Sequence, residues 1–262
     1  MPRKLGHSNC KELREAKVVN WCKSCLTADE LKLLGTLGSV LPALQDLWLR
    51  QPAAGPDGVR QLAAGLGVGA LPAVTWLFII DTHVGDAGAS ALAAALGQGA
   101  LPRLKRLILC NAATGDAGLV ALAPALRRLP ALEGLYLNVN PLGDEGLAAL
   151  VAPPPLAGAP PPTTGRLAKL KELYLCSTQI TDAGCDTLAA ALDSGALPAL
   201  KELYLHGIPA SAAAKDAVYA ARANLEGVES ESELEESGSE EEESELEDEG
   251  EDEAGEEDGE GL

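Results

Sequence analysis

The sequence is poor in aromatic residues, which make up 3% of its 262 positions, and it contains a single methionine. Long apolar runs are also missing, since Pro, Gly, Lys or Arg interrupts each one before the roughly 18 residues that a membrane helix needs. The N-terminus, MPRKLGHSNCKELREAK, lacks the apolar segment of a secretory signal. We therefore expect a soluble, monomeric intracellular chain, cytoplasmic or nuclear, that makes no membrane contact.

Cysteine is sparse, with six residues that are too few for a disulfide scaffold, so free thiols are expected. Cys22 and Cys25 form a C-x-x-C which, together with His7 and Cys10, has the spacing of a zinc site. The repeat described below argues against zinc, because it places Cys22 at the same position after a strand as Cys110. We expect no metal and no other cofactor, with structural zinc as the alternative.

Basic residues are missing after Arg222. Residues 226–262 hold 21 of the 39 acidic residues, which leaves 18 acidic against 20 basic residues in the first 225 positions, a net charge of +2. The acidic segment has too few apolar residues to offset the entropy of folding. The sequence therefore predicts a folded part followed by a disordered acidic tail at 226–262.

The acidic tail has two interpretations. It either solubilises the chain or attracts basic proteins such as histones, ribosomal proteins or basic import signals. Every serine in it is followed three residues later by an acidic residue, which resembles the substrate pattern of acidophilic kinases of the casein-kinase-two type. The predicted phosphorylation sites are Ser230, Ser232, Ser237, Ser239 and Ser244.

An internal repeat organises the folded part. A Leu-Pro or Leu-Ala pair recurs in steps of 30, 30, 28, 38 and 30 residues, at Leu41, Leu71, Leu101, Leu129, Leu167 and Leu197. Each unit opens with alternating apolar residues, as in LPALQDLWL and LPALKELYL, which indicates a short strand. A segment such as GDAGASALAAAL follows, in which the apolar period is helical.

The start of each helix carries a repeated pair of residues, in which Gly or Thr stands at the expected N-cap and Asp follows. Carboxylates there suit the positive end of the helix dipole, so we assign these residues to helix capping and not to catalysis. A glycine then precedes the inward leucines, as Gly88 precedes Leu92 and Leu96, and is expected to let the first turn approach the sheet closely. The pairs are Gly85-Asp86, Gly115-Asp116, Gly143-Asp144 and Thr181-Asp182.

The pattern LxxLxLxxxxL, followed by a helix and repeated every 28 to 30 residues, resembles the leucine-rich repeats of the ribonuclease-inhibitor class. The resemblance implies an α/β fold, a right-handed horseshoe solenoid with parallel strands on the concave face and helices on the convex face. The predicted parts are an N-terminal capping repeat at 1–40, six repeats at 41–225 and the tail at 226–262. Thr27 and Glu30 form a predicted capping box in the first part.

Two departures from a regular repeat stand out. A proline-rich insertion at 151–166 lengthens one step, and we interpret it as a tolerated surface loop or, as an alternative, a proline-motif docking site. The turn position that usually holds Asn or Cys varies, so a continuous asparagine ladder is not expected. Its occupants are Pro52, Thr82, Ala112, Asn140, Thr178 and Ile208.

The concave face is predicted to carry a ladder of large side chains, because residues between inward leucines point outward. Five of the eight aromatic residues share one strand position, and Trp76 also faces outward. Such a row favours partner binding, although the rings could instead simply stack and shield the sheet. The ladder consists of Trp48, Phe78, Ile108, Tyr136, Tyr174 and Tyr204.

Charges of both signs flank this ladder, with Lys105 and Arg106 at one strand start and Glu133, Lys171, Glu172, Lys201 and Glu202 at the next ones. Mixed charge does not favour a nucleic-acid groove. No Ser, Cys and His arrangement can be placed by the repeat, so the sequence predicts no catalytic residues and no enzyme.

Three functions remain. We expect a non-enzymatic scaffold that binds a protein partner on the concave face. The solenoid with an acidic tail also resembles Ran GTPase-activating proteins, which implies a regulator that helps a small GTPase hydrolyse GTP without being a hydrolase itself; Asn138 is the nearest contact residue by type. A looser resemblance to acidic leucine-rich nuclear phosphoproteins implies binding of histones or other basic proteins.

Overall fold

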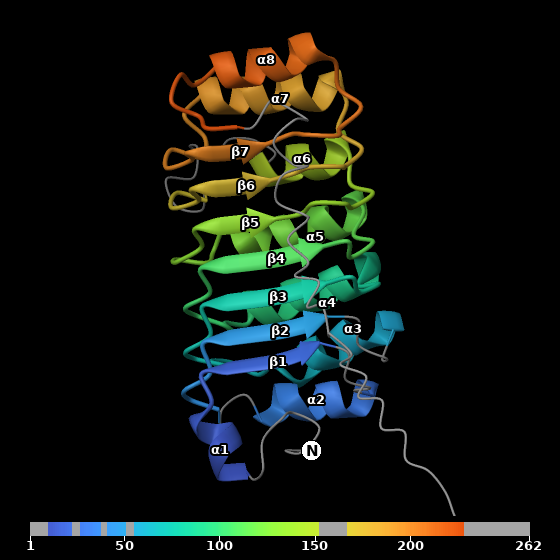
Figure 1. The fold of residues 1–262 in the computed structure, drawn as a ribbon, viewed down its shortest axis with the longest axis vertical. Helices are drawn as coiled ribbons and strands as arrows, with labels where there is room; N and C mark the ends of the chain where they lie inside the picture. Colours follow the sequence, from blue (N-terminus) through green and yellow to red (C-terminus); the bar gives the residue numbers. More distant parts are fainter. Residues whose placement is uncertain (1–9, 23–26, 38–40, 51–54, 152–166, 228–262) are drawn as a thin grey trace, which may run out of the picture. The chain divides into compact units, whose positions relative to one another are not determined.

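The computed structural model describes residues 10–22, 27–37, 41–50, 55–151 and 167–227 (Figure 1). The chain divides into two units, 1–228 and 229–262, and all described residues belong to the first. The predicted tail serines and most of the proline-rich insertion therefore lie outside the described residues. Within the described part, no helix is both long enough and apolar enough to cross a membrane.

The strands form one parallel sheet in which the spatial order equals the chain order. Parallel neighbours need a crossover between them, and the helical half of each repeat supplies it. The strands are β1 (Val18–Cys22), β2 (Asp46–Arg50), β3 (Trp76–Ile80), β4 (Arg106–Cys110), β5 (Gly134–Tyr136), β6 (Glu172–Tyr174) and β7 (Glu202–Tyr204).

The described helices lie on one face of the sheet, and we call the other face, on which no described helix lies, the open face (Figure 1). The predicted α/β solenoid of alternating strands and helices is confirmed. The helices are α1 (Cys10–Glu15), α2 (Ala28–Leu37), α3 (Gly55–Gly65), α4 (Gly85–Gly97), α5 (Asp116–Leu126), α6 (Asp144–Val151), α7 (Asp182–Asp193) and α8 (Ala212–Ala220).

The core is built from rows of leucine stacked along the sheet. Leu47, Leu77 and Leu107 pair directly in register on β2, β3 and β4, and all three are buried. The helices add their inward leucines, such as Leu92, to the same layer between sheet and helices. Each repeat thus buries its apolar residues against its neighbours, which is why the predicted leucine periodicity fixes the sheet order.

Aspartates at the helix starts tie each repeat to the next one. Asp86 Oδ1 accepts from the backbone N–H of Gly115 (2.8 Å) and of Gly118 (2.9 Å), at the start of the following helix. The predicted capping is confirmed, but each Asp caps the next helix and not its own. We call these contacts the aspartate links. The later links join Asp116 to Gly143 and Gly146, Asp144 to Thr181, and Asp182 to Ser211.

The helix-start glycines serve these links. A Cβ added at Gly118 would lie 2.6 Å from Asp86 Oδ1, and one added at Gly146 would lie 2.7 Å from Asp116 Oδ1. At Gly118 and Gly146 the missing side chain thus makes room for the carboxylate of the preceding repeat, a role that the predicted close approach to the sheet did not include, whereas a Cβ at Gly88 would meet Val84 Cγ1 at 2.8 Å. Gly85 differs from the predicted N-cap as well, because α4 begins at Gly85 itself.

The N-terminal end of the described unit contains the predicted capping box. Thr27 N–H donates to Glu30 Oε2 (3.0 Å), and Glu30 N–H donates to Thr27 Oγ1 (3.3 Å), so the two residues satisfy each other at the start of α2. Val19 is buried on β1, as expected. The next helix, α3, packs closely against α2, because a Cβ added at Gly35 would lie 2.5 Å from the Leu62 carbonyl oxygen.

The C-terminal end extends slightly beyond the predicted boundary. Glu226 pairs with Glu202 in a parallel bridge, and its N–H donates to the Lys201 carbonyl (2.7 Å), so the first predicted tail residue belongs to the sheet edge. Arg222 follows α8 and donates to the carbonyls of Leu197 (2.5 Å) and Ala196 (2.9 Å). Val151, assigned to the insertion, is the buried last residue of α6.

Replacing Gly118 with Ala tests the aspartate links. Alanine normally stabilises a helix interior over glycine by roughly 0.5–1 kcal/mol, but Gly118→Ala should lower the free energy of unfolding by about 1–3 kcal/mol because its Cβ would displace Asp86. Gly97→Ala in α4 is the matched control, since a Cβ there meets nothing within 4 Å. Urea denaturation measures both, and equal stabilisation by the two changes would contradict the assignment.

Candidate functional site

The open face of the sheet carries the predicted ladder in register. Trp48 pairs with Phe78, Phe78 with Ile108, and Ile108 with Tyr136, and the same position continues through Tyr174 to Tyr204. The aromatic members are half-buried, and the leucine or isoleucine on either side of each one is buried. The alternation of the strands therefore places the rings on the open face, opposite the described helices α2 to α8.

The ladder is two stacks and not one continuous row. In the first stack the rings of Trp48 and Phe78 lie 3.5 Å apart, and Trp76 lies 5.5 Å from Phe78. In the second stack Tyr174 lies 4.5 Å from Tyr136 and 4.3 Å from Tyr204. Ile108, only 6% exposed, separates the stacks because it has no ring to join them. The face thus offers a Trp/Phe stack and a tyrosine stack.

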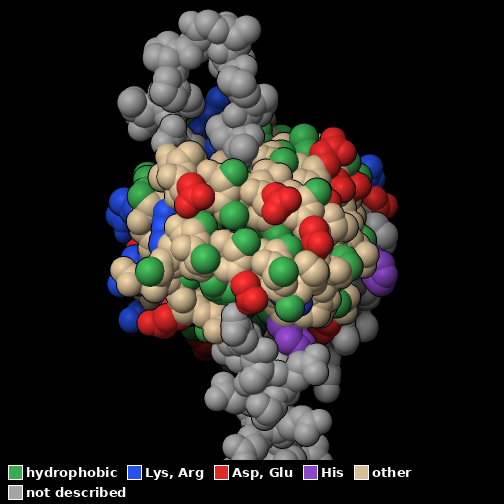
Figure 2. Space-filling model, turned by 90° about the horizontal axis from the view of Figure 1, so that it is seen from above, with side chains coloured by type: hydrophobic (Ala, Val, Ile, Leu, Met, Phe, Trp, Pro, Cys, Tyr) green, Lys and Arg blue, Asp and Glu red, His purple; other side chains and the backbone are tan. Residues whose placement is uncertain are grey.

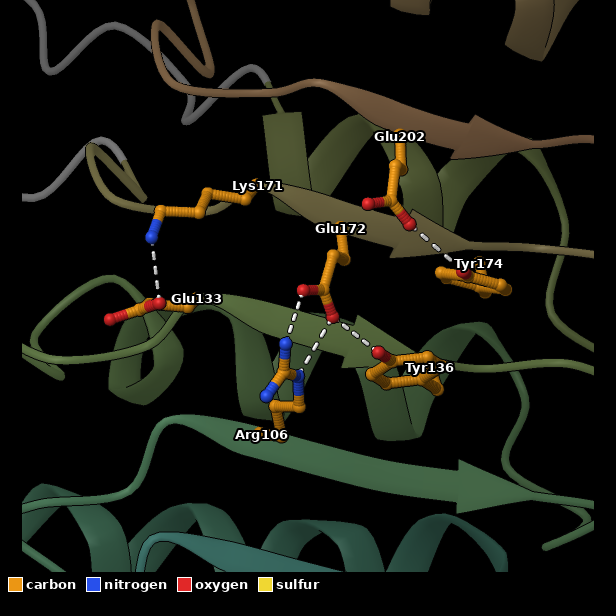
Figure 3. Close-up of polar contacts among 7 residues, drawn as sticks. All are labelled: Arg106, Glu133, Tyr136, Lys171, Glu172, Tyr174 and Glu202. Carbon is orange, nitrogen blue, oxygen red and sulfur yellow. Dashed lines mark hydrogen bonds and ion pairs between the residues drawn. The ribbon is translucent and has the colours of Figure 1, made fainter. Parts of the chain in front are cut away.

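A partly buried ion pair crosses the middle of the face (Figure 3). Arg106 Nε donates to Glu172 Oε2 (2.8 Å) and Nη2 donates to Oε1 (2.5 Å), while the Tyr136 hydroxyl donates to the same carboxylate. Glu172 is only 8% exposed. These contacts hold the pKa of Glu172 below its usual value, with the Arg106 hydrogen bond as the largest cause. The guanidinium of Arg106 is therefore already paired within the fold.

Gly134 makes that pair possible. It lies between Arg106 and Glu172 in the sheet, on β5, and has no side chain on the open face. A Cβ there would lie 2.9 Å from Glu172 Oε2 and 3.0 Å from Arg106 Cγ. The missing side chain lets the guanidinium reach across one whole strand. Neither Gly134 nor Glu172 was a predicted site residue, and the signal was a glycine at an outward strand position.

The guanidinium of Arg106 also contacts the Trp/Phe stack. Its Cζ lies 4.3 Å from the centre of the Trp76 ring, which is a cation–π contact. Arg106 thus joins the two halves of the face, with Trp76 on one side and Glu172 with Tyr136 on the other.

Tyrosine hydroxyls bind carboxylates on the following strand. Tyr174 donates to Glu202 Oε2 (3.0 Å), as Tyr136 donates to Glu172 (Figure 3). Burial and then the bond to Glu172 raise the pKa of Tyr136 to about 12, and burial followed by the bond to Glu202 raises the pKa of Tyr174 as well. Both hydroxyls stay protonated at neutral pH and hold their rings in fixed positions.

Most of the basic residues that were predicted to flank the ladder lie at the edge of the open face. Lys171 Nζ pairs with Glu133 Oε2 (2.8 Å), which lowers the pKa of Glu133, mainly through that hydrogen bond. Lys105 and Lys201 are exposed. Figure 2 shows Lys and Arg side chains along its left side, where the strands of Figure 1 begin. The open face itself is aromatic and mixed in charge.

Asparagines organise the turn that follows β5. Asn140 is buried and accepts from the N–H groups of Ala112 (3.1 Å) and Thr114 (3.0 Å). This single residue thus satisfies backbone groups of the neighbouring turn, as each member of a continuous asparagine ladder would. Asn138 Oδ1 accepts from Cys176 N–H (2.9 Å). The oxygen of the predicted contact residue Asn138 is therefore engaged within the fold.

Nucleophilic and metal chemistry find little support in the described residues. Burial raises the pKa of the Cys110 and Cys185 thiols to about 11 each, so neither is a thiolate at neutral pH. Among the described residues no group of three His, Cys, Asp or Glu is arranged to hold a metal ion. His7 and Cys25 of the zinc alternative lie outside the described residues.

Comparison with known proteins adds a relative of the same architecture. The ribonuclease inhibitor of Sus scrofa is 39% identical over 85 residues, which is 32% of this chain and 16% of that protein. This chain has the leucine-rich repeat fold, and its matched segment is similar in sequence to that ribonuclease inhibitor. The match spans only about a sixth of the relative's length, and no family model matches the chain.

Two similar solved structures have TM-scores below 0.5, and the leucine-rich repeat fold of this chain follows from its own repeats and strand order. Internalin C2 of Listeria monocytogenes is 19% identical with a TM-score of 0.43, covering 80% of this chain and 82% of its own. Actin-binding site 2 of leiomodin-1 is 15% identical with a TM-score of 0.41, covering 54% and 76%.

Replacing Glu172 tests the central ion pair of the leucine-rich repeat. Glu172→Gln should lower the free energy of unfolding at pH 7 by about 2 kcal/mol, because it removes charge-assisted bonds between the Arg106 guanidinium and a buried carboxylate. Since the folded state lowers the pKa of Glu172, this stability is present above pH 4.5, the ordinary value, and is lost as the pH falls through the lowered pKa.

Urea denaturation between pH 3 and 7 measures this change in stability. Glu145→Gln, which alters an exposed carboxylate on α6, is the matched control and should change stability by less than about 0.5 kcal/mol. An equal loss in both variants, or a loss in Glu172→Gln that is independent of pH, would contradict the role assigned to this pair.

Proposed function

We propose that this chain is a non-enzymatic scaffold that binds a protein partner on the open face of its sheet. The observation that carries the proposal is the pair of aromatic stacks on the open face, where none of the described helices lies. Aromatic side chains supply much of the energy of protein interfaces, and a chain with eight of them concentrates six on this face.

The stacks suit binding because they are already ordered. Tyr174 is held by its neighbours on both sides and by its bond to Glu202, and Trp76 is held by Phe78 and Arg106. A partner that covers such rings immobilises few free side chains, so little conformational entropy opposes association. The half-buried rings are therefore a preorganised contact surface.

The relative supports the same class of function. By its name, the Sus scrofa protein inhibits ribonuclease, so it acts on another protein. In our proposal the shared repeat serves this chain in the same general way, by presenting strand side chains to a protein, with a partner that its own side chains select.

The acidic segment is proposed to add a weaker attraction. Residues 229–262 carry acidic residues without a single Lys or Arg, which favours basic protein surfaces and extends the reach of the scaffold. Phosphorylation at the predicted serines would strengthen this attraction by adding charge. Binding of histones or other basic proteins stays an alternative primary role.

Capture from cell lysate tests the open face. A variant with Tyr136, Tyr174 and Tyr204 all changed to Ala should lose the partners that the full chain retains, since it removes one whole stack. The control changes Leu33, Val68 and Val120 to Ala, which alters exposed apolar residues away from that face and should keep the partners. Quantitative mass spectrometry compares the baits, after circular dichroism has shown that both variants fold.

Two outcomes would replace the proposal. Partners lost only from a chain that ends at Val228 would make the acidic segment the binding element and the solenoid a carrier. The GTPase-activator function would be favoured if the full chain speeds the hydrolysis of GTP by a Ran-type small GTPase and the Asn138→Ala variant does not. The scaffold proposal expects an unchanged rate of hydrolysis.

A further inference from the structure

Past the ends of β4 to β7, the sheet is bordered by short segments that carry no charge. In each segment the middle residue is buried and the outer two are exposed. None of these residues is Asp, Glu, Lys or Arg, whereas Lys105, Lys171 and Lys201 stand before the starts of three of these strands. We call this surface the uncharged rim. It consists of residues 111–113, 139–141, 177–179 and 207–209.

The first residue of each rim segment has a left-handed backbone. Its φ is 48° at Asn111, 56° at Val139 and 54° at Ser177, and Gly207 has a φ of 67°. Asn111, Val139 and Ser177 each donate their backbone N–H to a carbonyl of the next repeat, at 3.0, 2.8 and 2.8 Å. The stacking of the repeats therefore fixes the backbone at this position and uses only the N–H group of the residue.

Val139 is the residue least suited to this position. Glycine and asparagine adopt a left-handed backbone readily, but the branched Cβ of valine is crowded there. The apolar side chain of Val139 is also 51% exposed, so it contributes little to the core. Strained residues that the surrounding structure holds in place are concentrated at functional sites. The strain and the exposure together indicate that this side chain serves binding and not folding.

The surroundings of Val139 give the chemistry of what it contacts. Ala113 and Pro141, on the same rim, are exposed and apolar. Asn140 bonds the backbone on both sides of Ala113, which holds that alanine beside the Val139 segment. Val139 also follows Tyr136 of the tyrosine stack by three positions. The rim is thus an apolar continuation of the open face.

We infer that Val139, with Ala113 and Pro141 beside it, contacts an apolar side chain of the protein partner. The inference rests on the proposed function and deepens it by giving the chemistry of the partner at the rim. A charged group would lose its hydration there without gaining an ion pair, so the uncharged rim selects an apolar one. Covering Val139 in the complex also contributes hydrophobic free energy that offsets its strain.

Two substitutions separate the strain at residue 139 from the apolar contact. Val139→Asn removes both the branched Cβ and the apolar surface, so the unfolding equilibrium constant from urea denaturation should fall about fivefold. Val139→Thr keeps the branched Cβ and its strain but replaces a methyl group with a hydroxyl, so this constant should change by less than about twofold. Only the asparagine variant should therefore gain stability.

Capture from cell lysate then measures binding with these full-length variants as baits. The probe is the set of proteins that the full chain retains and the triple tyrosine variant loses. Val139→Asn should retain about tenfold less of these proteins, and Val139→Thr about threefold less. Binding that is lost while stability rises cannot come from unfolding. Val120→Asn, the same change at an exposed valine of α5, is the matched control and should change neither retention nor stability.

Three results would overturn the inference. The first is unchanged retention by Val139→Asn, and the second is a Val139→Asn chain no more stable than the original one. The third is a full chain that sediments as a dimer and becomes a monomer on Val139→Asn, which would assign the rim to a second copy. If the triple tyrosine variant loses proteins that Val139→Asn keeps, the scaffold proposal stands without the rim; if it loses none, both are rejected.

Discussion

The carboxylate that links one repeat to the next is the contact on which the regular stacking depends. Each repeat is too small to bury its own leucines, so its stability comes from its neighbours. Apolar packing alone does not fix how one repeat sits on the next. The aspartate links fix that position, because Asp86 reaches only the helix start that carries Gly118. From α4 to α8 these links hold each helix start at a fixed place on the preceding repeat.

On the open face, a missing side chain plays a similar part. Gly134 leaves room for Arg106 to reach Glu172 two strands away, and this pair orders Tyr136 and supports Trp76. The pair is buried enough that its bonds compete little with water. The missing side chain at Gly134 thus lets residues of separate strands form one connected, rigid surface, which is what a preorganised binding face requires.

Much of the fold could be predicted from the repeat. The leucine spacing gave the parallel sheet, the helix positions, the buried Val19 and the shared position of the rings, because period and alternation decide which side chains point inward. The sequence shows Ile108 in place of an aromatic residue, but it does not show that the rings on either side then form two separate stacks. The role of Gly118 was misjudged, since a glycine pattern does not reveal which neighbouring atom needs the space.

By itself the sequence determined the solenoid, its order of strands and the face on which the aromatic residues lie, because these depend on residues close together in one repeat. Only the tertiary structure decided which residues meet across repeats: Asp86 with the next helix, and Arg106 with Glu172 across β5. Those contacts depend on side-chain length, on the space left by glycine and on the spacing of neighbouring strands. None of these is encoded in the pattern of a single repeat.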